Sequence, residues 1–421
     1  MKKIMFYSQH LAGIGHLVRS TEIVRSLAQQ FEVYFVHGGQ AVPGFRLPAG
    51  VTEVPLPGLY MTGPVLKVVD ESQALDVVQE HRKALLLEVY DSIRPDCLVT
   101  EGFPFSKHTL QFELIPLLKH IEALGHPTQV VCCLRDIIMT QAMTDSVRAK
   151  KQARTCKWIN RYYDLVLYHS DPQLQRLEEN FPPVDQLKPE IFYTGYVTQT
   201  MAAAPPMGDE DRHYLSQPQP RIVVSVGGGR HGYELLDAIA NLAPTLAQTI
   251  PHKIYAFAGP YLPEADFLRL RQRATQSSNL VIRRFTPRLM DYLAGADLSI
   301  SLGGYNTTMN VLWTGVRSLI YPSPSEDQSG EQSLRARKLE SLGLLGVLDA
   351  ADLAPERLLQ RILTAPKQSP VAHHFNLAGA RQSALKLQQF LATEGVSSRP
   401  AMAATSTTSA SDYAALEGVR G

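Results

Sequence analysis

The first 200 residues alternate between two hydrophobic patterns. Short apolar runs are typical of buried strands, and longer segments in which apolar residues recur every three or four positions are typical of helices. The predicted strands are 3–8, 31–37, 97–100, 128–134, 165–169 and 191–193, and the predicted helices are 17–29, 73–93 and 110–124. Because strands and helices alternate, we expect a parallel, doubly wound sheet.

The same alternation starts again at residue 221, with strands at 221–226, 253–258, 280–283, 296–301 and 316–321 and helices at 233–246 and 307–313. Residues 201–220 separate the two halves; they are rich in Ala, Pro and charge and have no sustained apolar period. The last 27 residues, 395–421, are rich in Ser, Thr and Ala. We therefore expect an N-terminal domain at 1–200, a linker at 201–220, a C-terminal domain at 221–394 and a disordered tail at 395–421.

Composition changes this picture little. Lys and Arg number 41 and Asp and Glu 40, so no global charge favours nucleic acid. The four cysteines have no metal-ligand spacing, and we expect them to be reduced and mostly buried. An acidic run at 209–211 falls in the linker, which argues against a metal site there. The first residues carry no secretory signal and no apolar run approaches a membrane span, so we expect a cytoplasmic protein.

The segment 303–335 carries the most informative chemistry. A buried strand runs into Gly303 and Gly304, then Asn306 as an expected helix cap, then Thr307 at the expected start of the helix. Paired glycines allow the backbone to approach a diphosphate, and the free N–H groups of a helix start point at negative charge. The sequence predicts an anion site here.

Glu331 and Gln332 follow on a Pro- and Ser-rich loop just before another helix. A carboxylate accepts two hydrogen bonds, and an amide both donates and accepts. This pair suits adjacent hydroxyl groups of a sugar. Arg335 lies three residues further on, where a surface position on the helix is an equally good interpretation.

Two more glycine loops follow strands. In the first, Gly15 and His16 lie at the carboxyl edge of the first predicted strand, where His16 is placed either to accept a proton or to cap its own helix. In the second, Gly228 and Gly229 precede Arg230, whose guanidinium is suited to phosphate.

These loops together resemble a known family. The span from about 2 to 390 resembles a GT-B glycosyltransferase of family 28, related to the lipid II N-acetylglucosaminyltransferase, and looks closest to a bacterial branch of it. The block 303–335 is the most specific match, and the other matching segments are GIGHLVR at 13–19, Arg94-Pro95-Asp96, Glu101 to Phe105, Leu134-Arg135-Asp136 and Asp171-Pro172. The resemblance implies two Rossmann-like domains that face each other across a cleft.

The resemblance also implies a function: metal-independent sugar transfer from a nucleoside-diphosphate sugar, with UDP favoured, to a hydroxyl acceptor, without a cofactor. The C-terminal domain would hold the donor and the N-terminal domain the acceptor, while His16 acts on the acceptor hydroxyl. Many relatives carry a ribose-binding glutamate where this chain has Asn310. Asn310 can still bond a ribose, but more weakly than a carboxylate.

Further residues of the N-terminal half are expected near the acceptor. Glu101 is an alternative base. Near the same strand end lie four further candidates, Phe103, Phe105, His108 and Glu113. Phe103 and Phe105 also fit the floor of the cleft, and Glu113 also fits a solvated helix face. Arg135-Asp136 fits a local ion pair that shapes the cleft.

The basic, aromatic segment 148–163 fits either an interfacial membrane helix, at the inner face of the membrane with a lipid-linked acceptor, or a solvated basic face over a core. The first glycine loop also resembles that of a nucleotide-sugar hydrolase, in which His16 would activate water. Asn310 keeps a third interpretation open, a nucleotide-sugar sensor without turnover. A dinucleotide oxidoreductase is disfavoured, because the first loop lacks the full G-x-G-x-x-G and the second strand ends without an acidic residue.

Overall fold

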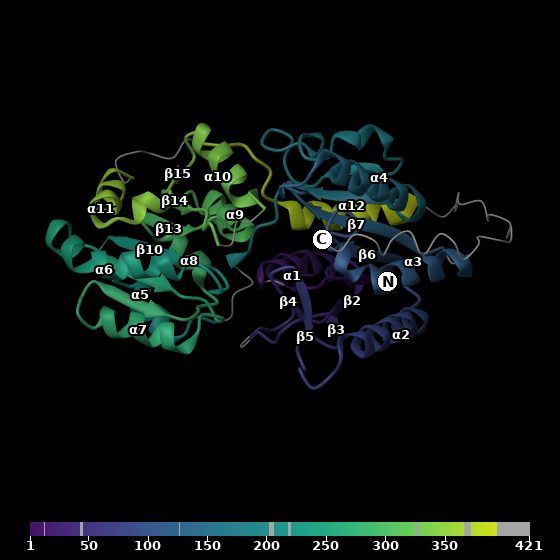
Figure 1. Ribbon diagram of the computed structural model, residues 1–421, viewed down its shortest axis with the longest axis horizontal. Coiled ribbons are helices and arrows are strands. Elements are labelled where there is room, and N and C mark those ends of the chain that lie inside the picture. The colour runs from purple at the N-terminus through teal and green to yellow at the C-terminus, as the bar shows by residue number, and fades with distance from the viewer. Residues whose placement is uncertain are drawn as a thin grey trace.

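The structure is a computed structural model that describes residues 1–11, 13–42, 45–125, 127–201, 206–217, 220–325, 327, 329–365 and 372–393. The chain forms two lobes, each built on its own parallel sheet with helices against it, and the two lobes lie side by side (Figure 1). The predicted doubly wound fold is confirmed in both halves.

The N-terminal sheet has the strand order β3-β2-β1-β6-β7-β8-β9, and all its pairs are parallel. The strands are β1 (Lys3–Tyr7), β2 (Glu32–His37), β3 (Val51–Pro55), β6 (Cys97–Glu101), β7 (Gln129–Arg135), β8 (Leu165–His169) and β9 (Glu190–Tyr193). The helices of this lobe are α1 (Gly15–Leu27), α2 (Leu75–Ile93), α3 (Gln111–Leu124) and α4 (Asp145–Tyr162). An antiparallel hairpin, β4 (Leu59–Thr62) and β5 (Val65–Val68), lies outside the main sheet.

The second sheet has the order β12-β11-β10-β13-β14-β15 and is also parallel. Its strands are β10 (Arg221–Ser225), β11 (Lys253–Phe257), β12 (Leu280–Arg283), β13 (Leu298–Leu302), β14 (Ser318–Tyr321) and β15 (Gly346–Val347). Its helices are α6 (Tyr233–Thr249), α7 (Glu264–Ala274), α8 (Leu289–Ala294), α9 (Tyr305–Thr314), α10 (Glu331–Ser341) and α11 (Pro355–Thr364). Short 3-10 turns complete the fold at His108–Leu110, Leu177–Glu179, Pro182–Gln186 and Ala350–Leu353.

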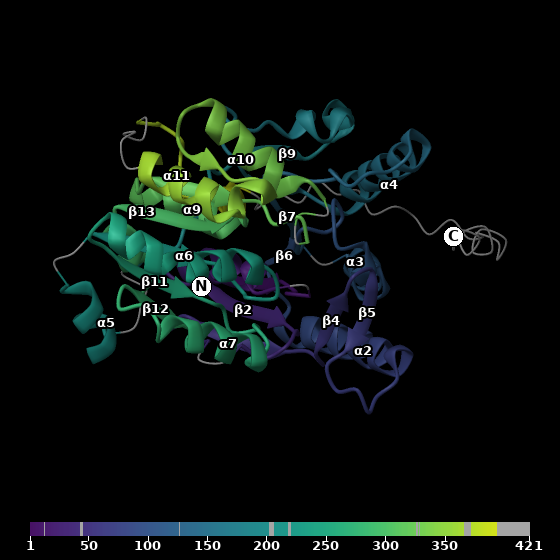
Figure 2. The ribbon, with the colours of Figure 1, turned by 60° about the vertical axis from the view of Figure 1, so that its left-hand side comes forward.

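Two segments depart from the expected domain boundaries. The expected linker contains a short helix, α5 (Asp209–Leu215; Figure 2), whose Asp211 is buried and pairs with Arg283. The last helix, α12 (Gly379–Thr393), packs on α1 (Figure 1) and contributes Ala384, Leu387 and Leu391 to the N-terminal core. The expected C-terminal domain, 221–394, therefore gives its last helix to the N-terminal lobe, and the expected tail 395–421 lies outside the described residues.

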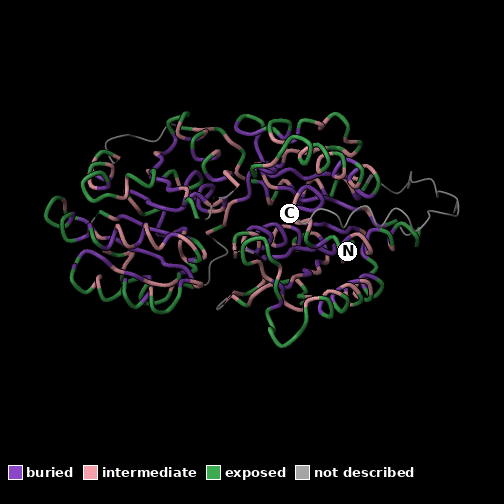
Figure 3. Tube along the Cα trace, viewed as in Figure 1, coloured by how far each residue is buried: buried purple, intermediate pink, exposed green. Residues whose placement is uncertain are grey.

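Both lobes have a continuous apolar core along their sheets (Figure 3). All four cysteines are buried and unpaired, as the sequence predicts. Among the described helices, none has the length and apolar character needed to cross a bilayer. Because every pair within each sheet is parallel, the strand ends Glu101 and Arg135 share one edge of the first sheet and Leu302 and Tyr321 one edge of the second. These edges carry the candidate site.

Candidate active site

His16 forms a pair with Glu101. His16 lies in the first turn of α1, and its Nδ1 is 2.8 Å from Oε1 of Glu101 at the end of β6. The imidazole is a quarter exposed, whereas the carboxylate is buried. Burial lowers the pKa of His16 to about 3, against the opposing effect of Glu101. A neutral imidazole that donates from Nδ1 keeps Nε2 as an acceptor of protons.

Glu101 also binds two cations. Arg19 donates to Oε1, and Nζ of Lys107 donates to Oε2 and, at 2.5 Å, to the carbonyl of Gln9. Burial alone raises the pKa of Glu101, but His16, Lys107 and Arg19 outweigh it and hold that pKa well below its usual range. Glu101 is thus an ionised group behind His16, and the expectation that it is an alternative base is not supported by this geometry.

The glycine pair before α9 faces the first glycine loop. The N-cap of α9 is Gly304, so the expectation that Asn306 caps the helix is wrong. Asn306 lies within the first turn, and its Nδ2 donates to the carbonyl of Gly15 at 2.9 Å. The side chain of Asn306 therefore bonds to the N-terminal lobe and not to the backbone of its own helix. Thr307 follows, buried in the same turn.

The second glycine loop approaches β11 closely. Gly229 has a φ of +83°, and a Cβ there would overlap the carbonyl oxygen of Ala258. Gly228 lies beside Ile14 of the opposite lobe. The Cζ of Arg230 lies 4.8 Å from the ring centroid of Tyr261. The guanidinium also donates to the side chain of Gln40 in the N-terminal lobe. A guanidinium at this edge is accessible to phosphate.

Glu331 and Gln332 lie at the start of α10, and both are buried. Glu331 accepts from Arg135 of the N-terminal lobe and from Nη2 of Arg335 at 2.5 Å. Gln332 lies against Gly303, where a Cβ would come within 3.2 Å of Oε1, and this Oε1 has no hydrogen-bond partner in the structure. A buried carbonyl without a partner is costly, so Gln332 is the better prepared of the two to bind a ligand.

Arg335 and Asp136 form an ion pair between the lobes. Nε and Nη2 of Arg335 donate to the two carboxylate oxygens of Asp136 at 2.7 and 2.9 Å, and both side chains are 1% exposed. The expected local pair Arg135-Asp136 is therefore wrong, because Asp136 pairs with Arg335 and Arg135 with Glu331. The surface interpretation of Arg335 is wrong for the same reason.

Asn310 does not face an open site. It is 1% exposed, its Nδ2 donates to Oε1 of Gln199 at 2.6 Å, and its Oδ1 accepts from the Gln199 backbone at 3.2 Å. Both ends of the amide are occupied by the chain just before the linker. The expected contact with a ribose is therefore blocked in this structure.

The acceptor residues expected after Glu101 are mostly structural. Phe103 and Phe105 are core residues, with Phe103 stacked on Trp158. Glu113 is fully buried and forms a two-pronged pair with Arg82 at 2.6 and 2.9 Å, so the solvated interpretation of Glu113 is wrong. His108 lies beside Trp158, and burial lowers its pKa to about 4.

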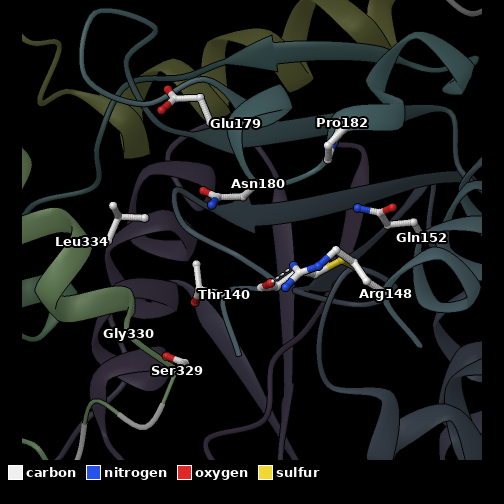
Figure 4. Close-up of a pocket in the computed structure, with 10 residues that line it drawn as sticks. Thr140, Arg148, Gln152, Glu179, Asn180, Pro182, Ser329, Gly330 and Leu334 are labelled. Carbon is white, nitrogen blue, oxygen red and sulfur yellow. Dashed lines mark hydrogen bonds between the residues drawn. The ribbon is translucent and has the colours of Figure 1, made fainter. Parts of the chain in front are cut away.

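A cavity of about 460 Å³ opens between the lobes (Figure 4). Most of the side chains around it are polar, and they come from both lobes: Thr140, Arg148, Gln152, Glu179 and Asn180 from the N-terminal lobe and Ser329 from the loop before α10. Nη1 of Arg148 donates to the carbonyl of Met139 at 2.9 Å. Arg148 and Gln152 lie in the basic segment 148–163 and Ser329 in the segment 303–335, whereas Thr140, Glu179 and Asn180 were not sequence-based candidates.

Sequence reasoning also missed Lys107 and Arg19 as partners of Glu101. Arg19 follows His16 by three residues and so shares its helix face, which is a signal the sequence does carry. Lys107 carries no such signal, since a left-handed backbone (φ +55°) turns it back toward β6. In the described part of the chain, no group of three or more His, Cys, Asp or Glu side chains is arranged to hold a metal ion.

Comparison with known proteins agrees with this architecture. The glycosyltransferase family 28 C-terminal domain matches residues 223–387. This match covers most of the C-terminal lobe and supports the resemblance to glycosyltransferase family 28. Two relatives carry the name UDP-N-acetylglucosamine–N-acetylmuramyl-(pentapeptide) pyrophosphoryl-undecaprenol N-acetylglucosamine transferase. That of Oenococcus oeni is 25% identical over 170 residues, which is 40% of this chain and 44% of the relative. That of Lactococcus lactis is 26% identical over 144 residues, 34% of this chain and 39% of the relative.

The chain thus matches less than half the length of each of these relatives. Solved structures extend the likeness of fold to the whole chain. MurG of Acinetobacter baumannii covers 93% of this chain with 100% of its own length, at a TM-score of 0.53 and 16% identity. Phytolacca americana UGT2, solved with UDP-2fluoro-glucose and pterostilbene, covers 93% with 94% of its length, at a TM-score of 0.58 and 13% identity. The expected GT-B fold, with two Rossmann-like domains, is confirmed.

Proposed function

We propose that this protein is a glycosyltransferase that moves a sugar from a nucleoside-diphosphate sugar, with UDP favoured, to a hydroxyl acceptor without a metal ion. One observation carries the proposal. A neutral His16, fixed through Nδ1 by Glu101, lies on the loop whose Gly15 carbonyl accepts from Asn306 in the first turn of α9. A proton acceptor and a helix start suited to a diphosphate therefore meet at the contact of the two lobes.

In this mechanism Nε2 of His16 takes the proton of the acceptor hydroxyl. The acceptor oxygen bonds to the anomeric carbon as the bond from that carbon to the diphosphate breaks, and the nucleoside diphosphate leaves. The ionised Glu101 stabilises the imidazolium that forms, so it acts by orienting His16 and by its charge. The N–H groups at the start of α9, together with Arg230, meet the charge that develops on the diphosphate.

We assign the donor to the C-terminal lobe, along the glycine loops at Gly228 and Gly303. Gln332 offers its unpartnered Oε1 to a sugar hydroxyl. Glu331 becomes available only when Arg135 releases it. Because Asn310 is held by Gln199, the ribose is bound by other groups or by the backbone.

We assign the acceptor to the cavity between the lobes, next to α4. The names of the relatives include a pyrophosphoryl-undecaprenol acceptor, and a lipid-linked acceptor at the inner face of the membrane fits the cations of α4. Among the described residues, no carboxylate pairs with five of these cations, Arg148, Lys150, Lys151, Arg154 and Lys157. Vesicles containing anionic lipid test this contact: Lys150→Glu combined with Lys157→Glu is expected to abolish sedimentation with them, and unchanged sedimentation argues against it.

The first experiment is a thermal-shift screen against UDP-, GDP-, dTDP- and CMP-linked sugars and the free nucleotides, with release of nucleotide followed in the hits. Stabilisation by one sugar nucleotide with release only upon addition of an acceptor supports a transferase. Rapid release without acceptor indicates the hydrolase instead, and binding without turnover indicates the sensor. His16→Ala is expected to abolish release while donor binding persists, whereas His81→Ala, at an exposed position on α2, is the matched control.

A further inference from the structure

The ring of Tyr305 contacts two guanidinium groups from opposite lobes. The Cζ of Arg19, in the N-terminal lobe, is 5.3 Å from the ring centroid, and the Cζ of Arg335, in the C-terminal lobe, is 5.4 Å from it. Tyr305 is 6% exposed. Cation–π contacts are strongest where water is excluded, so both of these contacts are well placed to fix the cations.

Each guanidinium also binds a carboxylate of the candidate site. Arg19 donates to Glu101, which holds His16. Arg335 donates to Glu331, beside the predicted sugar site. An unbroken series of contacts therefore runs from the proposed base to the donor half through one aromatic ring.

Arg19 depends on this ring more than Arg335 does. Its Nε has no hydrogen-bond partner, and Glu101 is its one hydrogen-bonded side chain among the described residues. Arg335, in contrast, is also fixed by Asp136 from two nitrogens. Without the ring, the guanidinium of Arg19 keeps a single point of attachment and gains rotational freedom.

We propose that Tyr305 is a positioning residue that holds Arg19, and through it the Glu101–His16 pair, in register with the donor loops when the lobes are together. The proposal rests on the function proposed above for its catalytic consequence. The hydroxyl plays a separate part, since it accepts from the backbone N–H of Val197 at 3.0 Å. The ring, not the hydroxyl, is the coupling element.

The first measurement is the rate at which His16 is chemically modified in the protein without ligand. Diethyl pyrocarbonate modifies neutral histidine, and peptide mass spectrometry gives the rate at His16 between pH 4.5 and 8. In the wild type and in Tyr305→Phe, which keeps the ring, the rate is expected to stay constant. In Tyr305→Leu, the displaced Arg19 neutralises Glu101 less, and Lys107 and Arg135 are the cations left facing the pair. The rate at pH 4.5 is then expected to fall about threefold below that at pH 8.

Turnover is read second, as release of UDP from UDP-N-acetylglucosamine in the presence of the acceptor that supports release in the screen, with the Kd for UDP from calorimetry. Tyr305→Leu is expected to lower kcat about tenfold while KM and the Kd for UDP change less than about twofold. Tyr305→Phe is expected to leave kcat, KM and the Kd unchanged. A constant modification rate in Tyr305→Leu, or a loss of kcat in Tyr305→Phe as large as in Tyr305→Leu, overturns the proposal. If the wild type binds no nucleotide, the proposed function fails, and the modification rates still decide the role of the ring. Tyr305→Met, closer to the ring in volume, replaces the Leu variant if that variant does not fold.

Discussion

Replacing Glu101 with Gln tests the charge arrangement beneath His16. Glu101 is 1% exposed, and the Arg19 and Lys107 side chains that bind it are 2% and 10% exposed. The substitution leaves both cations in place without a counter-charge. Breaking a buried pair in this way costs about 3–5 kcal/mol. For a domain of this size, that corresponds to a fall in melting temperature of about 10 °C.

The difference between wild type and Glu101→Gln also has a predicted pH dependence. The pKa of Glu101 is depressed in the folded state, so its stabilisation is fully present above the unfolded pKa of about 4.3 and is lost as the pH falls toward the folded pKa. We expect the difference in unfolding free energy to be constant from pH 8 to about pH 5 and to shrink below pH 4. Urea unfolding followed by circular dichroism at each pH measures it.

The matched control is Glu53→Gln, which removes a carboxylate that also lies 2.8 Å from a histidine, His37, but is 57% exposed. An exposed pair contributes less than about 1 kcal/mol, so the control is expected to unfold nearly as the wild type does. A loss in Glu101→Gln no larger than that of the control would refute the buried charge cluster. A difference that grows as the pH falls would refute the sign of the pKa shift.

Three further predictions concern neighbouring features. Lys107→Met removes a cation that lowers the pKa of His16, so the acid limb of the pH profile of nucleotide release is expected to move to higher pH. Asn310→Ala is expected to cost about 1–3 kcal/mol in urea unfolding, because it strands the amide of Gln199, while the Kd for UDP stays within about twofold. Gly229→Ala is expected to lower the melting temperature by several degrees and to weaken UDP binding, since both its positive φ and its contact with β11 reject a side chain; an unchanged melting temperature would contradict this.

The two sheets could be predicted from the sequence, because most of their strands are continuous apolar runs. β8 and β12 have the predicted bounds, and most other predicted strands are shifted by only one or two residues. β3 was missed, since it lies at an edge and exposes Thr52, Glu53 and Pro55, so its pattern is not apolar. α12 was not predicted, and a helix period at 379–393 shows which face is buried but not which sheet buries it.

The site was predictable where local sequence determines it. The glycine loops and His16 follow strand ends, and the carboxyl ends of parallel strands meet at one edge of a sheet. The location of these residues at that edge could therefore be predicted. The partners of the charged residues were not predictable, because they come from distant strand ends. Asp136 is adjacent in sequence to Arg135 but binds Arg335, which is 199 residues away. Asn310 marked a departure from the family, but its partner Gln199 lies 111 residues earlier.

The charge at the contact of the lobes is local and does not show in the overall composition. The whole chain is nearly neutral, with a formal net charge of +1. Among the described residues that form the linked ion pairs of the site, four permanent cations face three carboxylates: Arg19, Lys107, Arg135 and Arg335 against Glu101, Asp136 and Glu331. The excess positive charge lies with Arg19 and Lys107, which share Glu101, whereas Arg135 and Arg335 balance Glu331 and Asp136. Arg135 is nevertheless the most exposed of the four at 32%, and it shares Glu331 with Arg335. In the proposed function, an incoming diphosphate attracts Arg135 away from Glu331 at the least cost, because Arg135 is partly exposed and its carboxylate keeps a second cation. The release of Arg135 then frees Glu331 for the sugar.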